Sequence, residues 1–180
     1  MKSFLPSMFY YGFPVVLLTT IDKDGNADVT PISCNFTLGT NAVIALVKLN
    51  KAYHNVMEVP EVVFNLPSAE MWEKVEAIAP YTAQNPVPPQ KAGKYAYTDD
   101  KFAIGGFTQL PSEKVRVPRI AECPIQAEAV VKQVNDRGTY ALIELEFVQV
   151  HAEDHLVMEE NKINPLAWEP LIYNFKHYYG

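Results

Sequence analysis

The chain has 180 residues, a length typical of one domain, and 48% of them are hydrophobic, so it can form a full core. Its formal net charge of −6 argues against a protein that binds nucleic acid by neutralising many phosphates. Two cysteines, Cys34 and Cys123, lie far apart and lack metal-ligand spacing, which favours buried, reduced thiols and no metal site. We therefore expect a single domain over residues 1–180.

The N-terminal residues contain one lysine and no long apolar stretch, so we expect no signal peptide. No apolar run approaches the roughly 20 residues that a membrane-spanning helix needs. These features predict a cytoplasmic protein without a membrane partner.

The first element is a strand over residues 14–21 (PVVLLTTI), which is apolar nearly throughout and should be covered on both faces. An Asp-x-x-Gly turn at residues 22–25 follows, and it predicts a hairpin with a return strand over residues 26–34. Pro31 in that return strand is typical of a sheet edge or a bulge, because proline cannot donate to a ladder.

A third buried strand is expected over residues 42–48 (AVIALVK) and a fourth over residues 62–67 (VVFNLP). Between them, the pattern predicts a short helix from about Lys51 to Glu58, stopped by Pro60. Ser68 is a good N-cap for a second helix over residues 69–79. One face of that helix carries an apolar stripe that we assign to the core: Met71, Trp72, Val75, Ile78 and Ala79.

Residues 80–100 contain four prolines, at positions 80, 86, 88 and 89, and they show little regular pattern. Loops of this length in a compact domain tend to be functional or mobile. The second half is again β-rich, with strands over residues 123–134 and 139–153 around a turn at 135–138, and a further hairpin over 156–164. Recurring hairpins with few helices indicate a mainly β, α+β protein, a small barrel with short helical inserts.

No catalytic signature such as a nucleophile elbow, a phosphate-binding glycine loop or a zinc-binding His pair is present. The most suggestive polar stretch lies at the start of the first predicted helix, where free N–H groups and the helix dipole favour an anion. The alternative is an ordinary solvated helix start. The stretch comprises Lys48, Asn50, Lys51, Tyr53, His54 and Asn55.

Several segments, in order, resemble the flavin reductase-like family of FMN-binding split barrels, and its flavoredoxin-type members in particular. They cover about residues 13–180. The matching segments are PVVLLTTIDKDGNADVTPISCNF, VIALVKLNKAYHNV, VVFNLPS, TDDKFAIGGFTQLPSEKVRVPRIAEC and YNFKHYYG.

The resemblance implies an FMN-binding split β-barrel that forms a homodimer, with FMN near the subunit interface. It places the phosphate at residues 48–55, with Lys51 as the first candidate, and Asn65 at a strand end beside the flavin. Tyr53 and His54 stand where many relatives carry a threonine. Contacts to the flavin ring would come from the end of the return strand: Pro31, Ile32, Ser33, Cys34 and Asn35.

Three functions are compatible with this resemblance. The first is an NAD(P)H-dependent reductase of FMN, or of another acceptor through bound FMN. The second is a flavoredoxin-like carrier that passes electrons between protein partners without being an enzyme. The third is a split barrel that binds another ligand, such as heme, or none. Under the first two, we expect residues 80–100 to border the flavin and partly cover it.

Overall fold

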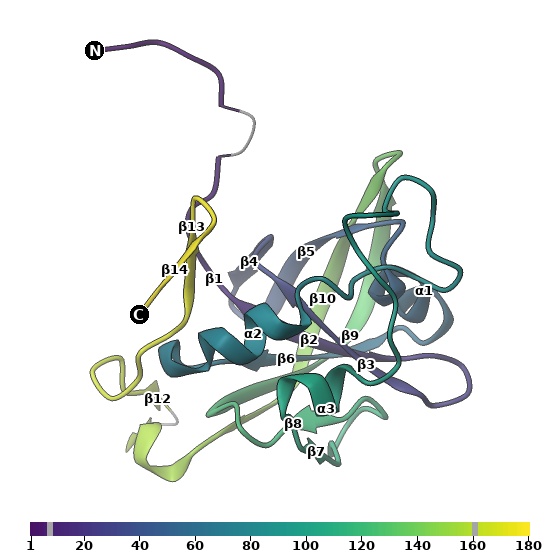
Figure 1. Ribbon diagram of the computed structural model, residues 1–180. Coiled ribbons are helices and arrows are strands. Elements are labelled where there is room, and N and C mark those ends of the chain that lie inside the picture. The colour runs from purple at the N-terminus through teal and green to yellow at the C-terminus, as the bar shows by residue number, and fades with distance from the viewer. Residues whose placement is uncertain (7–8, 160–161) are drawn as a thin grey trace.

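The computed structural model describes residues 1–6, 9–159 and 162–180, and most of its regular structure is β (Figure 1). The helical elements are α1 (Lys51–Glu58), η1 (Ala69–Met71), α2 (Trp72–Ile78), α3 (Lys101–Gly105) and η2 (Asp154–Leu156). The strands are β1 (Tyr11–Pro14), β2 (Val16–Ile21), β3 (Ala27–Ile32), β4 (Asn35–Leu38), β5 (Asn41–Val47), β6 (Glu61–Leu66), β7 (Gln109–Leu110), β8 (Arg119–Ile120), β9 (Ile125–Asp136), β10 (Tyr140–Ala152), β11 (Val157–Met158), β12 (Lys162–Ile163), β13 (Ile172–Asn174) and β14 (His177–Tyr179).

Seven strands form the main antiparallel sheet in the order β3-β2-β6-β9-β10-β5-β4. Its two end strands, β3 and β4, follow each other along the chain with only Ser33 and Cys34 between them. The amide of Ala45 on β5 donates to the carbonyl of Cys34 at 3.1 Å. A sheet whose opposite edges are joined this closely must curl on itself. The mainly β split barrel with short helical inserts is therefore confirmed.

Strand β2 is buried along its whole length, as its apolar sequence predicts. Alternate side chains point to opposite faces of a strand. Val16 and Leu18 join the cluster inside the barrel, whereas Leu17 joins a second cluster with residues of α2 and α3. The expectation that both faces are covered is thus confirmed, and each face has its own core.

The predicted hairpin after β2 is also confirmed. The carboxylate of Asp22 accepts hydrogen bonds from the amides of Asp24 and Asn26 at 3.0 and 2.9 Å. Gly25 adopts a φ of +86°, a left-handed conformation that glycine tolerates best. The return strand β3 lies at one end of the sheet order, the edge position that Pro31 predicts.

Helix α1 has the predicted bounds, and its buried Ala52 and Val56 pack into the barrel core. Strand β5 differs from the expectation of full burial, because its exposure alternates along the strand. The predicted helix after Ser68 begins as the 3-10 turn η1 and continues as α2, and the side chain of Ser68 makes no capping hydrogen bond.

The assignment of Trp72 to the core is wrong. Met71, Val75 and Ile78 are buried in the second cluster, but Trp72 is 46% exposed. One residue advances a helix by about 100°, so a side chain directly after Met71 turns away from the face that Met71 occupies. Helix α2 therefore has a core face and a separate face that carries Trp72.

The second half contains the predicted long hairpin, β9 with β10, and the shorter one, β11 with β12. Residues 160–161 of the shorter hairpin lie outside the described residues. The sequence did not predict α3 or the small sheets β7-β8 and β1-β13-β14. No helix in the described part of the chain is long and apolar enough to span a membrane.

A buried ion pair joins α3 to the sheet. The Nζ atom of Lys101 lies 2.8 Å from Oδ1 of Asp28 on β3, and both side chains are only 2% exposed. Lys51 at the start of α1 lies 4.0 Å from the same carboxylate oxygen. Two lysines from different helices thus depend on one buried aspartate.

We expect Asp28→Ala to destabilise the protein by about 3–5 kcal/mol, because it leaves the buried Lys101 ammonium without its counter-charge. Urea unfolding measures the loss. The matched control is Asp136→Ala, which removes the exposed partner of Lys48 and should change stability much less. Equal losses from the two variants would contradict the role given to the buried pair.

Candidate functional site

A cavity of about 440 Å³ opens where the chain crosses from β3 to β4. Its size falls within the range of about 300–1,000 Å³ that is usual for small-molecule sites. The walls come from the strand crossover, the start of α1, the segment 80–100 and the C-terminal sheet. The lining residues are Tyr10, Val15, Pro31, Ile32, Ser33, Cys34, Ala45, Val47, Asn50, Ala79, Thr82, Lys91, Tyr95, Tyr173 and Tyr178.

The structure brings four of the five predicted ring-contact residues to this cavity: Pro31, Ile32, Ser33 and Cys34. Asn35 comes next in the chain, and its side-chain amide donates to the carbonyl of Pro14 at 3.1 Å. These residues gather here because β3 ends at Ile32 and the chain turns into β4.

Lys91, in the segment 80–100, is the cation of this cavity, and its residue is only 7% exposed. Its ammonium donates to Oδ1 of Asn50, and to the hydroxyl and carbonyl of Thr82 at 3.0 and 3.2 Å. These acceptors are neutral, and among the described residues no carboxylate forms an ion pair with Lys91. Burial, and then the nearby charge of Lys101, lowers the pKa of Lys91 to about 8. The cavity thus holds a desolvated cation that an anionic ligand would stabilise.

The sequence did not single out Lys91, because a lysine in a proline-rich segment matches no phosphate-binding motif. Its position was signalled only indirectly, by the length of the segment that contains it. Thr82, Lys91 and Tyr95 of that segment line the cavity, so residues 80–100 border it. Whether they cover a bound flavin stays a prediction.

Lys51 points away from this cavity. Its Nζ atom approaches Asp28 and lies 5.4 Å from the ring centroid of Tyr97. It lines a different, acidic pocket together with Asp22, Asp99 and Asp100. Lys51 and Asn50 are neighbours in sequence, but they line different pockets.

The other residues predicted to hold the phosphate have partners elsewhere. Lys48 forms an ion pair with Asp136. Tyr53 packs against the barrel core, and its ring meets the exposed His54 edge-on. Asn55 is buried and donates from its side-chain amide to the hydroxyl of a β2 threonine at 3.0 Å.

Asn65 lies in the core beside β2. Its amide nitrogen donates to the carbonyl of Leu17 at 2.9 Å, and its oxygen accepts the amide of Ile120 at 2.7 Å. These bonds join β6 to its neighbours β2 and β8. Apart from the residues at the strand crossover, Asn50 is the only predicted site residue that lines the cavity.

The two cysteines have different surroundings. Cys123 is fully buried, and burial strongly raises the pKa of its thiol. Cys34 lines the cavity, and its thiol donates to the hydroxyl of Tyr10 at 3.8 Å. The electrostatic interaction with Cys34, and then burial, raises the pKa of Tyr10, so the Tyr10 hydroxyl remains protonated near neutral pH.

The curled sheet and the ligand-sized cavity at its strand crossover define a split-barrel protein of the kind found among flavin reductases. Residues 8–180 match the family model of the flavin reductase like domain. The chain therefore belongs to the flavin reductase-like family, and the resemblance seen in its sequence is confirmed. A relative, YdfE of Bacillus subtilis (strain 168), is 38% identical over 183 residues, which cover 99% of this chain and 88% of YdfE.

Solved structures share the fold. Flavoredoxin of Desulfovibrio vulgaris (Miyazaki F) is similar with a TM-score of 0.82 at 19% identity, over 99% of this chain and 92% of flavoredoxin. The FMN-binding protein of Thermus thermophilus with bound 1-cyclohex-2-enone is similar with a TM-score of 0.75 at 14% identity, again over 99% of this chain and 92% of that one.

Proposed function

We propose that this protein binds FMN in the cavity at the β3–β4 crossover and acts as an NAD(P)H-dependent oxidoreductase in the cytoplasm. The observation that carries the proposal is Lys91, a desolvated cation that faces a ligand-sized cavity without a carboxylate partner among the described residues. Bound FMN would supply the hydride and electron chemistry, so the protein needs only to bind and orient it. This division of work agrees with a sequence that carries no catalytic motif.

The lining fits the two parts of FMN. Tyr10, Tyr95 and Tyr173 offer aromatic surface for a flat ring system, and the small Ser33 allows close approach at the strand crossover. We assign the ring to the predicted segment Pro31, Ile32, Ser33, Cys34 and Asn35. We assign the phosphate to Lys91, with the side chains of Asn50 and Thr82 beside it.

Local charge supports a phosphate here although the chain carries −6 overall. Burial, and then the charge of Lys101, lowers the pKa of Lys91. Burial also lowers the pKa of Lys101, although the charge of Asp28 acts in the opposite direction. Asp28 is the carboxylate that pairs with Lys101 and Lys51. Lys91 itself has only neutral hydrogen-bond acceptors among the described residues, so a phosphate dianion would supply its counter-charge.

The absorption spectrum of the purified protein, before and after anaerobic NAD(P)H, tests the proposal. We expect a flavin spectrum that bleaches on addition of the donor. A spectrum of heme, or no cofactor binding after FMN is added, would overturn it. The likeness to flavoredoxin favours one second candidate, a carrier that exchanges electrons with protein partners. A bound flavin that NAD(P)H does not reduce, but a reduced partner protein does, would identify the carrier.

We expect Lys91→Met to weaken FMN binding roughly ten- to hundredfold, since a charge-assisted hydrogen bond contributes about 1.5–3 kcal/mol. Riboflavin, which lacks the phosphate, should lose far less affinity. Fluorescence titration of both flavins measures the effect. Lys51→Met is the matched comparison, because the sequence favoured Lys51 as the phosphate ligand.

A pH series gives the same test an independent readout. Lys91 is charged below its pKa of about 8 and neutral above it, so FMN affinity should fall as pH rises through and beyond that value. The Lys91→Met variant should not show this decrease in FMN affinity with rising pH. If Lys51→Met instead weakens FMN selectively and Lys91→Met does not, the phosphate lies at Lys51.

We also propose that the protein is a homodimer. Large apolar side chains are exposed on the edge strand β4, with Phe36 at 61% and Leu38 at 72%, and C-terminal Tyr179 is 56% exposed. Phe36 and Leu38 lie two residues apart and so share one face of β4, and exposed apolar surface of this kind marks interaction sites. Light scattering at micromolar concentration should give the mass of two chains, and Leu38→Asp should shift it toward one. A flavin-bound wild-type monomer would disprove the proposal.

A further inference from the structure

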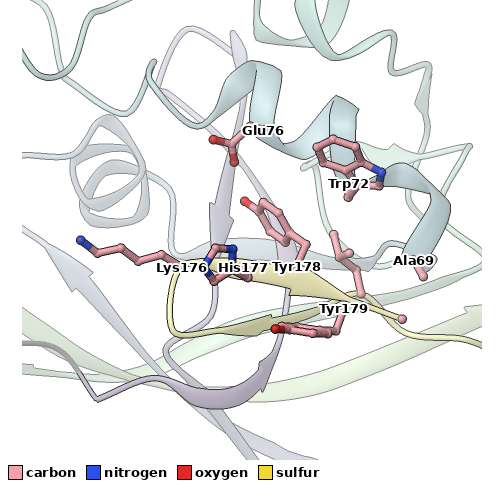
Figure 2. A pocket seen from close by; sticks show the side chains of 9 residues that line it. Ala69, Trp72, Glu76, Lys176, His177, Tyr178 and Tyr179 are labelled. Carbon is pink, nitrogen blue, oxygen red and sulfur yellow. The ribbon is translucent and has the colours of Figure 1, made fainter.

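A second groove, of about 420 Å³, lies between α2 and the C-terminal strand β14 (Figure 2). Ala69, Trp72 and Glu76 line it from the helical side. Ala79, three residues after Glu76, lines the proposed FMN cavity. These four residues are separated by three, four and three positions, so their side chains lie on one helical face.

The groove and the FMN cavity are therefore neighbours along α2. Tyr178 of β14 lines both of them. From Ala69 to Ala79 the helical segment rises about 15 Å, at about 1.5 Å per residue. This distance suits a ligand with two ring systems joined by a flexible linker, one ring in each space.

The groove offers different chemistry along its length. Trp72, which is 46% exposed, presents an indole at one end, and Glu76, Lys176 and His177 lie toward the other, with Tyr178 between them (Figure 2). The hydroxyl of Tyr178 points toward Glu76 (Figure 2), and burial, followed by the charge of Glu76, raises the pKa of Tyr178. A carboxylate has about four acceptor positions, so Glu76 can accept hydroxyl donors.

We propose that this groove binds the adenosine half of NADH while the nicotinamide reaches the FMN cavity, an inference that rests on the proposed function. Adenine stacks on Trp72, the adenosine ribose donates to Glu76 one helical turn further on, and Lys176 contacts the diphosphate. A carboxylate at the ribose accepts its 2′-hydroxyl and repels a 2′-phosphate, so NADH is preferred to NADPH.

Direct binding of ADP-ribose, which lacks nicotinamide and transfers no hydride, tests the groove without turnover. The chain has two tryptophans, so Trp168→Phe leaves Trp72 as the only indole. Trp168 does not line this groove. In that background we expect saturable quenching of tryptophan fluorescence by ADP-ribose. The 2′-phosphorylated analogue should bind more weakly, and Glu76→Gln should narrow the difference. Absence of saturable quenching would overturn the inference.

Steady-state kinetics gives a second readout, the ratio of the KM for NADH to that for 1-benzyl-1,4-dihydronicotinamide, a donor without the adenosine half. Base stacking on an aromatic side chain contributes about 1–3 kcal/mol, so Trp72→Ala should raise this ratio about tenfold. The matched control Trp168→Phe should leave it unchanged.

The two proposals fail in different ways. If the protein neither holds flavin nor oxidises NADH, the proposed function is wrong, and the ADP-ribose titration still decides whether the groove binds adenosine. If NADH is oxidised but Trp72→Ala leaves the KM ratio unchanged, only the adenosine site is wrong.

Discussion

The buried carboxylate of Asp28 is the charge on which the rest of the site depends. It pairs with Lys101 of α3 at 2.8 Å and lies 4.0 Å from Lys51 of α1. Burying an unpaired charge is costly, so each lysine must keep its ammonium group near the carboxylate of Asp28. This requirement restricts the positions that α1 and α3 can adopt. One residue of the edge strand β3 therefore anchors two helices and the end of the segment 80–100 that leads into α3.

The same charges shape the cavity. Lys101 uses the negative charge that Asp28 provides, and its own positive charge acts on Lys91. Lys91 has neutral acceptors in Asn50 and Thr82. An acidic chain thus has a buried cation without a carboxylate partner among the described residues, in a cavity with aromatic walls. This combination explains how an acidic chain could hold a phosphorylated flavin.

Helix α2 packs one face into the core and presents another face to an open groove. Met71, Val75 and Ile78 bury one face in the core beneath the barrel. The face that carries Trp72 and Glu76 borders an open groove beside the proposed FMN cavity. The core face fixes the position of the helix, and with it the residues that line the groove. Such preorganisation lowers the entropic cost of binding.

The sequence by itself determined the strands β2, β3 and β6, the hairpin at Asp22 and the bounds of α1, because periodicity and turn chemistry act between near neighbours. The family resemblance also pointed to Pro31, Ile32, Ser33 and Cys34, and the structure places them in one cavity. Only the tertiary structure decided that Lys91 faces this cavity, that Lys51 turns toward Asp28 and that Trp72 is exposed. Lys101 meets Asp28 across 73 residues of chain, and spacing along a sequence carries no information about such a contact. Which charges meet depends on how the elements pack, and that packing minimises the free energy of the whole chain.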